Sequence, residues 1–163
     1  MGKGGVSEGA MVKYLREYNR KISQRKAVHI VRTYVEESSR EGINHDVAFI
    51  QMCHETDFLR FSGTVSPSQN NFCGLGTVSE SVAGYFFPNI RTGIRAHIQH
   101  LKAYASSESL ANRCVDPRFT LVRRNSASDI FELTGKWAAD KRYGELLKKK
   151  MDCLIDMENA HRR

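Results

Sequence analysis

The sequence predicts a mainly α-helical domain with one small β element. Apolar residues recur at helical spacing through five segments. Capping residues mark where those segments begin and end. Only residues 77–87 combine β-branched and aromatic residues with a turn signal, so we expect one short hairpin there. A chain of 163 residues is long enough to bury its own core, and we treat residues 1–163 as a single domain.

The first three helices are predicted from their caps. Ser7 precedes the first helix, Ser23 precedes the second, and Asn44 precedes the third. Gly42 ends the second helix, in the role that glycine commonly takes after a helix, and the third ends at Glu55. The apolar stripe of the first helix consists of Met11, Leu15, Tyr18 and Ile22.

The second half of the chain alternates loops and helices. Residues 61–71 are rich in Ser, Gly, Pro and Asn and read as a loop. Residues 91–105 form an amphipathic helix, and Ser128 caps a short helix through Leu133. The last helix spans residues 141–158. We expect its inward side chains to be Tyr143, Leu146, Leu147, Met151, Leu154 and Ile155.

The formal net charge of +7 indicates either a solvated basic surface or attraction to a polyanion. The basic residues are scattered, without zinc-finger spacing or an RNA-binding aromatic motif, so we do not expect nucleic acid as a partner. No apolar run reaches the length of a membrane span. Residues 1–6 hold no signal peptide, and we expect this Gly-rich start to be disordered or a cloning remnant.

No metal or cofactor is expected. The four cysteines include no Cys-x-x-Cys pair, and they allow three disulfide connectivities between which the sequence does not choose. A Cys53–His54 nucleophile is disfavoured, because adjacent residues of a helix do not face each other. His97 and His100 lie on a helix with an apolar face, which favours surface or packing roles over metal binding.

Glu55 is the strongest candidate for a catalytic residue. It follows Gln51 by four residues and Met52 by three, so it shares the buried face of its helix. A turn-rich segment at residues 70–76 follows. Most carboxylates at helix ends are ordinary solvated groups, but burial beside a cleft would raise the pKa and make Glu55 a general acid. Asp57 is a nearby alternative, although on a continuing helix it would point elsewhere.

Three motifs resemble the glucosaminidase domain of glycoside hydrolase family 73. The first is an apolar helix ending in a Glu, here Glu55, and the second is the turn Asn71-Phe72-Cys73-Gly74-Leu75, with Cys73 where Phe is common. The third, at residues 135–144, is similar to the family's Tyr-Ala-Thr-Asp-Pro-x-Tyr-Ala motif. Trp137 replaces its first Tyr and Lys141 its Pro, while Asp140 and Tyr143 match. The resemblance runs from about residue 43 to about residue 147.

The resemblance implies a lysozyme-like helical fold with a small β-hairpin lobe beside the cleft. It also implies a peptidoglycan hydrolase, an endo-β-N-acetylglucosaminidase that cleaves the β-1,4 bond after N-acetylglucosamine. Glu55 would be the acid, and Glu80 or the substrate's own acetamido group the second catalytic group. The substrate-binding residues would be Asn71, Phe72, Trp137, Asp140 and Tyr143.

Other interpretations remain open at this point. Trp137 could be a core anchor, Tyr143 could be a packing residue of the last helix, and Glu80 could be an exposed turn residue. The protein could be a lytic transglycosylase or muramidase, or a non-catalytic wall-binding module. As a hydrolase it would bind glycan strands as a monomer, in the periplasm, in the cell envelope or outside the cell.

Overall fold

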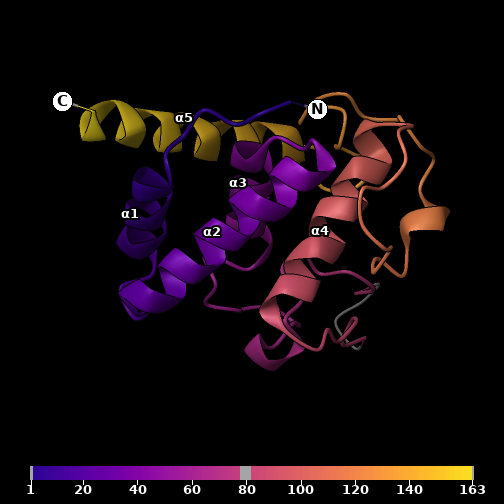
Figure 1. The fold of residues 1–163 in the computed structure, drawn as a ribbon, viewed down its shortest axis with the longest axis horizontal. Helices are drawn as coiled ribbons and strands as arrows, with labels where there is room; N and C mark the ends of the chain where they lie inside the picture. Colours follow the sequence, from indigo (N-terminus) through magenta and orange to yellow (C-terminus); the bar gives the residue numbers. More distant parts are fainter. Residues whose placement is uncertain (1, 78–81, 163) are drawn as a thin grey trace.

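The computed structural model describes residues 2–77 and 82–162, and these form a helical structure (Figure 1). The α-helices and the two 3-10 helices are α1 (Glu8–Tyr18), α2 (Gln24–Glu41), α3 (His45–Glu55), η1 (Pro67–Gln69), α4 (Ile90–Ala105), η2 (Phe119–Leu121) and α5 (Tyr143–His161). The prediction of a mainly α-helical protein is therefore confirmed.

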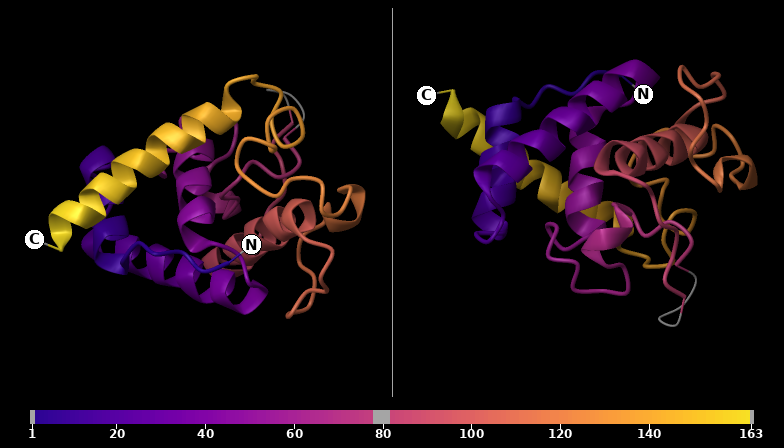
Figure 2. Two further views of the ribbon diagram at one scale, coloured as in Figure 1. Left: turned by 90° about the horizontal axis from the view of Figure 1, so that it is seen from above. Right: turned by 60° about the horizontal axis from the view of Figure 1, so that its bottom comes forward.

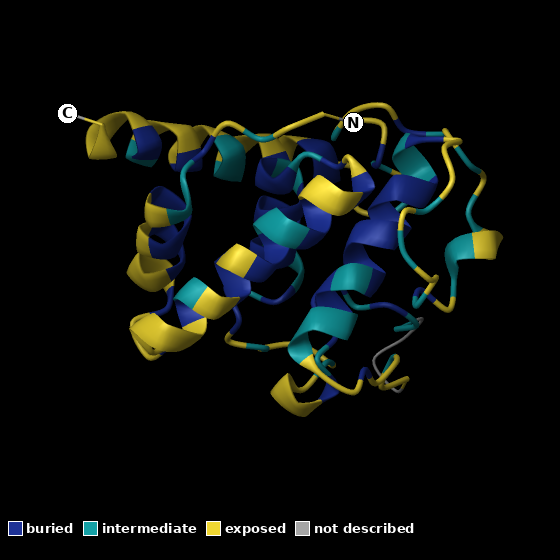
Figure 3. Cartoon of the chain, in the orientation of Figure 1, coloured by how far each residue is buried: buried dark blue, intermediate teal, exposed yellow. Residues whose placement is uncertain are grey.

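Helix α3 is the centre of the fold, because it contacts α2, α4 and α5. Seen from above, α2 and α5 lie on either side of α3, while α1 packs against both α2 and α5 (Figure 2). The inward faces of these helices are buried and their outward faces are exposed (Figure 3). This arrangement places the C-terminal end of α3, where Glu55 lies, among side chains from several segments.

The predicted caps are present. Ser7 accepts a hydrogen bond from the backbone of Ala10, and Ser23 does the same for Lys26. Asn44 caps α3, and Gly42 ends α2 with a left-handed φ of 69°. The predicted stripes are wrong at two positions, since Tyr18 and Ile155 are each 42% exposed.

The expected β-hairpin at residues 77–87 is not seen in the described residues. Tyr85 donates a single backbone hydrogen bond to Leu75 (2.9 Å), and Phe87 donates one to Gln69 (2.8 Å). These isolated bonds tie the segment to the preceding loop, so residues 82–87 form no ladder with a partner strand. The prediction of a hairpin lobe is wrong for this part of the chain. Glu80, the expected second carboxylate, lies outside the described residues.

The predicted short helix from Ser128 to Leu133 is also wrong, because side chains bind its backbone instead. The Asp129 carboxylate accepts hydrogen bonds from the amides of Phe131 (2.8 Å) and Glu132 (3.0 Å). The Glu132 carboxylate accepts a bond from the Ser128 hydroxyl (2.9 Å). Such local bonds offer the backbone an alternative to a helix.

Residues 2–6 lie against the domain, unlike the disordered start that we expected. The Gly5 amide donates to the carboxylate of Asp46 on α3 (2.7 Å), and the amide of Gly2 donates to the carbonyl of Gly42 (3.1 Å). Val6 is only 7% exposed and belongs to the hydrophobic core.

A left-handed turn follows α3 directly. Asp57, Phe58 and Leu59 have φ values of 49°, 54° and 60°, a conformation that costs a non-glycine residue about 1–2 kcal/mol. The side-chain amide of Asn19 donates a hydrogen bond to the Phe58 carbonyl (2.8 Å), and the ring of Tyr18 stacks on the Phe58 ring with centroids 4.3 Å apart. Tertiary contacts therefore hold the turn against its backbone strain.

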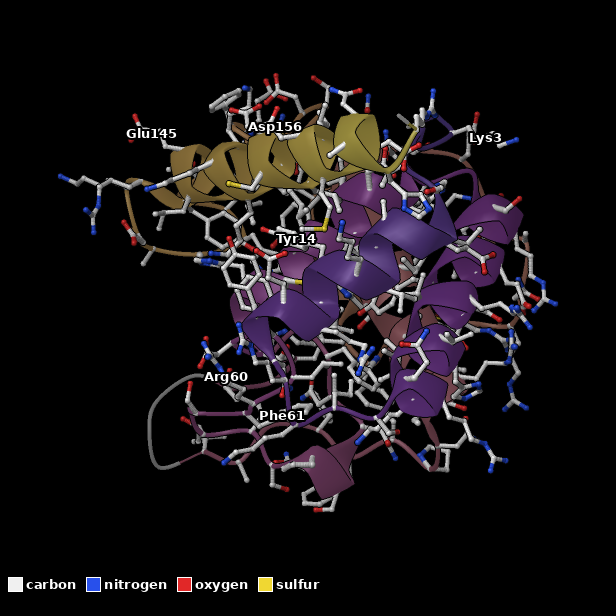
Figure 4. All side chains as sticks on the ribbon, turned by 90° about the vertical axis from the view of Figure 1, so that its left-hand side faces the viewer. Lys3, Tyr14, Arg60, Phe61, Glu145 and Asp156 are labelled. Carbon is white, nitrogen blue, oxygen red and sulfur yellow. The ribbon has the colours of Figure 1, made fainter. Side chains whose placement is uncertain are left out.

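Figure 4 looks onto this side of the molecule, with Tyr14 between α1 and α5 and with Arg60 and Phe61 just beyond the turn. The Tyr14 hydroxyl donates to the carbonyl of Lys150 on α5 (3.3 Å). Within the described residues, the helices are all too short or too polar to cross a membrane.

Candidate active site

Glu55 ends α3 and receives two hydrogen bonds on one carboxylate oxygen. The indole N–H of Trp137 donates to Oε1 at 3.0 Å, and the hydroxyl of Tyr143 donates to the same oxygen at 2.5 Å. Trp137 lies in the loop before α5, and Tyr143 is the first residue of that helix. No hydrogen bond from the described residues reaches Oε2. One oxygen of Glu55 is thus fixed, and the other is available to a ligand.

The surroundings of Glu55 favour its protonated form. Burial raises the pKa of Glu55, and the hydrogen bonds from Tyr143 and Trp137 offset this only in part. Neither donor carries a charge, and no salt bridge among the described residues includes Glu55. The residue remains partly exposed to solvent. It therefore combines a pKa above the ordinary value of a glutamic acid with access to solvent, as a general acid requires.

A chain of buried polar side chains continues inward from Tyr143. The amide nitrogen of Gln51 lies 2.9 Å from the Tyr143 hydroxyl, and its oxygen lies 3.0 Å from Nε2 of His97. The hydroxyl of Tyr34 lies 2.9 Å from Nδ1 of His97. Gln51, His97 and Tyr34 are each 0% exposed. Burial lowers the pKa of His97 to about 3, so its ring is neutral near physiological pH.

A pocket of about 170 Å³ adjoins Trp137. Its walls come from residues 73–77, from His100 and Tyr104 on α4, and from Arg118. The Trp137 ring packs against His100 with centroids 4.9 Å apart and against Tyr104 at 5.6 Å. Because its N–H also bonds Glu55, Trp137 connects the pocket with the candidate acid. Trp137 is partly exposed at this position, and it also packs against both hydrophobic clusters of the core.

A larger hollow of about 770 Å³ lies between α1 and the start of α2. Its lining includes the cations of Lys21, Lys26 and Arg60, but not Glu55. Size alone therefore does not locate the candidate site. The arrangement of donors around Glu55 does.

Asn71 and Phe72 lie behind the pocket rather than at its surface. The Asn71 amide nitrogen donates to the carbonyls of Leu75 (2.9 Å) and Tyr85 (3.2 Å), and its oxygen accepts from the Leu75 amide (3.0 Å). Phe72 is 4% exposed and packs edge-on against Tyr34. Both residues shape the loop that forms one wall of the pocket, and neither offers a free group to a substrate.

Two acidic residues near Glu55 are already engaged. Asp140 is exposed, and it accepts a hydrogen bond from the amide of Arg142 (2.8 Å) at the start of α5. Asp57 pairs with Arg60 at 2.5 Å, and hydrogen bonds from Arg60 lower the pKa of its carboxyl. Asp57 therefore stays ionised and does not supply the acidic proton.

Sequence reasoning missed the roles of His97 and Tyr34. Both were visible only as members of amphipathic helices, and His97 was expected at the surface or in packing. The one available signal was the spacing of Gln51 and Glu55, which puts an amide on the same helix face as the candidate acid.

Comparisons with known proteins agree with this geometry. A family model described as mannosyl-glycoprotein endo-beta-N-acetylglucosaminidase matches residues 31–155, which include all the site residues above. An uncharacterized protein of Borreliella burgdorferi is 46% identical over 162 residues, which cover 99% of this chain and 79% of that protein. No solved structure was found to match. The chain therefore belongs to the glucosaminidase family, the family 73 glycoside hydrolases, as its motifs predicted.

Proposed function

We propose that the protein is a peptidoglycan hydrolase, an endo-β-N-acetylglucosaminidase that uses Glu55 as its general acid. The observation that carries the proposal is the position of Glu55, a carboxylate with a raised pKa at the end of a buried helix, whose donors among residues 2–77 and 82–162 are uncharged. Family membership supports a glycoside hydrolase. The acidic envelope polymers around such a substrate are compatible with the net charge of +7.

In the proposed reaction Glu55 transfers its proton to the oxygen of the scissile glycosidic bond. The C1–O bond breaks, the leaving sugar departs as an alcohol, and positive charge develops at C1. Either Glu80 or the substrate's 2-acetamido oxygen stabilises that charge. Water then supplies the hydroxyl group at C1, and its remaining proton restores the protonated form of Glu55. Trp137 provides an aromatic wall for a sugar ring. Arg118 and Lys136, which line the pocket, complement the carboxylates of the stem peptides.

Two other functions are compatible with this site. A lytic transglycosylase or a muramidase would also need a single principal acid, and a wall-binding module would need the pocket without catalysis. As a glucosaminidase, the protein would act as a monomer on glycan strands in the periplasm, in the envelope or outside the cell.

The nature of the newly formed chain end tests the proposal. Purified peptidoglycan is incubated with the protein, and the released fragments are analysed by mass spectrometry before and after borohydride reduction. We expect reducing ends that carry N-acetylglucosamine. Anhydro ends would identify a transglycosylase and reducing N-acetylmuramic acid a muramidase. Absence of any turnover, with retained binding, would identify a wall-binding module.

A further inference from the structure

The buried side chains behind Glu55 form a hydrogen-bond chain that has only one consistent direction. Tyr34 is fully buried, and its hydroxyl has one partner among the described residues, Nδ1 of His97. If Tyr34 donates to Nδ1, the proton of the neutral His97 ring lies on Nε2. That N–H then donates to the Gln51 oxygen at 3.0 Å.

The same logic continues to the candidate acid. With its oxygen accepting from His97, Gln51 donates one of its side-chain amide N–H groups to the Tyr143 hydroxyl oxygen at 2.9 Å. Tyr143 then directs its own proton toward Oε1 of Glu55 at 2.5 Å. Each polar side-chain atom in this chain then has a hydrogen-bond partner, as buried polar groups require.

The opposite direction fails at both ends. It would leave the buried Tyr34 proton without an acceptor, which is costly for a hydroxyl group away from water. It would also require Glu55 to donate its proton inward through Oε1 to Tyr143, away from any substrate. The two directions therefore differ in where the acidic proton lies.

We propose that Tyr34, His97 and Gln51 are positioning residues that keep Tyr143 as a donor to Oε1 of Glu55, and that they thereby place the acidic proton on Oε2. The inference rests on the proposed function, since it assigns the oxygen that protonates the leaving group. Trp137 contributes to the same arrangement, because its N–H also occupies Oε1.

The titratable groups that face Glu55 do not compete with it. Burial raises the pKa of Tyr143, on α5, and of Cys73, in the loop after η1, far above their usual ranges. His97 on α4 is neutral above a pKa of about 3. His54, which packs on the Tyr143 ring at 5.3 Å, has a pKa lowered by burial. We therefore expect the ionisation of Glu55 to set the high-pH limb of the pH–rate profile, where the rate falls as the acid loses its proton.

The direction of the chain can be read without a substrate. In protein labelled with 15N at histidine, long-range NMR correlations distinguish the two neutral tautomers of His97. We expect the Nε2–H tautomer at neutral pH and persistence of the neutral ring in mildly acidic solution. The Nδ1–H tautomer, or a charged ring, would overturn the proposal, whatever the protein does to peptidoglycan.

Two variants test the effect on catalysis. Gln51→Met keeps the length of the side chain and removes both hydrogen bonds, and Tyr34→Phe removes the hydroxyl that sets the direction. Tyr14→Phe is the matched control, because Tyr14 is also a buried tyrosine, and its hydroxyl bonds the Lys150 carbonyl on α5, away from the chain behind Glu55.

In Gln51→Met the Tyr143 hydroxyl becomes free to accept the Glu55 proton. We expect kcat to fall about tenfold with little change in KM, because a misplaced catalytic group costs rate more than binding. This bond from the Glu55 carboxyl to the Tyr143 hydroxyl stabilises the protonated form of Glu55. The pKa of Glu55 therefore rises, and the high-pH limb of kcat/KM moves to higher pH. Tyr34→Phe should also lower kcat and move the high-pH limb to higher pH, but by less than Gln51→Met does.

A fall in kcat together with a shift of the high-pH limb separates a positioning role from a loss of folded protein. Loss of folded protein would lower activity without moving the high-pH limb. Tyr14→Phe should leave kcat and the limb unchanged. An unchanged limb and unchanged kcat in folded Gln51→Met would overturn the proposal. Inactive Glu55→Gln beside active wild-type protein would still support Glu55 as the acid, so failure of the positioning role is distinguishable from failure of the proposed function.

Discussion

Helices α2 and α3 both carry carboxylates near their C-terminal ends, buried on α2 and half-buried on α3, but the partners of those carboxylates differ in charge. On α2, the side chain of Glu37 meets the guanidinium groups of Arg91 and Arg95, and that of Glu41 meets the ammonium group of Lys102. On α3, the donors that reach Glu55 from the described part of the chain are the uncharged side chains of Trp137 and Tyr143.

The pKa shifts follow the partners. Burial alone would raise the pKa of Glu37 and Glu41, but hydrogen bonds from arginine in one case, and from backbone amides and Lys102 in the other, outweigh it and lower both values. At Glu55 the effect of burial prevails, and the pKa is raised. Burial by itself therefore does not identify an acid. A buried carboxylate without a cation does.

The comparison predicts that Glu55→Gln is the most damaging change to activity. Glutamine preserves the shape of the side chain and cannot transfer a proton, so kcat should fall by about 10²–10⁴-fold. The melting temperature should not fall, because no charged partner loses its counterion. Turnover of purified peptidoglycan and a thermal melt on the same sample measure the two effects, and near-normal turnover would remove Glu55 from the mechanism.

Glu37→Gln should show the reverse pattern. Arg91 and Arg95 lose a buried counterion, and we expect a loss of about 3 kcal/mol in the free energy of unfolding, the lower end for a broken buried pair, because both arginines keep some contact with water. Activity per folded molecule should be unchanged. Urea denaturation measures the loss.

Glu36→Gln is the matched control for this variant. Glu36 pairs with the same Arg91 at 2.7 Å, but both side chains are more than a third exposed. An exposed pair contributes about 0–1 kcal/mol. If the two variants lose equal stability, the burial of Glu37 has no energetic significance.

The pH dependence of stability should have opposite signs for the two carboxylates. The lowered pKa of Glu37 stabilises the protein above 4.5, the ordinary value, and this contribution is lost as the pH falls toward the folded-state pKa. The raised pKa of Glu55 means that its ionised form destabilises the protein at higher pH, and this penalty disappears as the pH falls below 4.5.

Glu37→Gln should therefore be less stable than wild-type protein near neutral pH, and this difference should shrink in acid. Glu55→Gln should be more stable than wild-type protein near neutral pH, and that difference should also shrink in acid. Melting temperatures of the three proteins across an acidic pH series measure both trends. Parallel curves for the two variants would contradict the assignment of opposite pKa shifts.

Trp137→Phe should have the smallest effect. Phenylalanine keeps an aromatic wall but loses the N–H that bonds Glu55, so the pKa of Glu55 should rise and the high-pH limb should follow it. We expect roughly a fivefold loss in kcat/KM, from about 1 kcal/mol of lost contact and hydrogen bonding, with a near-native melting temperature. Full activity with a large fall in melting temperature would make Trp137 a packing residue.

What the sequence predicts well is local. Ser7, Ser23 and Asn44 cap helices because their side chains bond amides two or three residues away. The orientation of Glu55 follows from helical spacing. The helix predicted at residues 128–133 is wrong because the carboxylates of Asp129 and Glu132 accept hydrogen bonds from backbone amides of the same segment.

The long-range part of the site could not be predicted in the same way. Tyr34, His97 and Tyr143 come from α2, α4 and α5, and they meet only because all three helices pack on α3. Nothing in the spacing of one helix shows which polar residue on another will lie opposite. Recognition of the family motifs supplied Trp137 and Tyr143, but it did not supply the chain behind them.

The left-handed turn after α3 also restricts which residues can replace Phe58 and Leu59 during evolution. Glycine at Phe58 or Leu59 would remove backbone strain of about 1–2 kcal/mol. The same change would empty a packed site, because these side chains are only 6% and 9% exposed, and truncating such residues costs about 2–5 kcal/mol. The side-chain loss is the larger, so selection for stability opposes the residue that the backbone alone would favour.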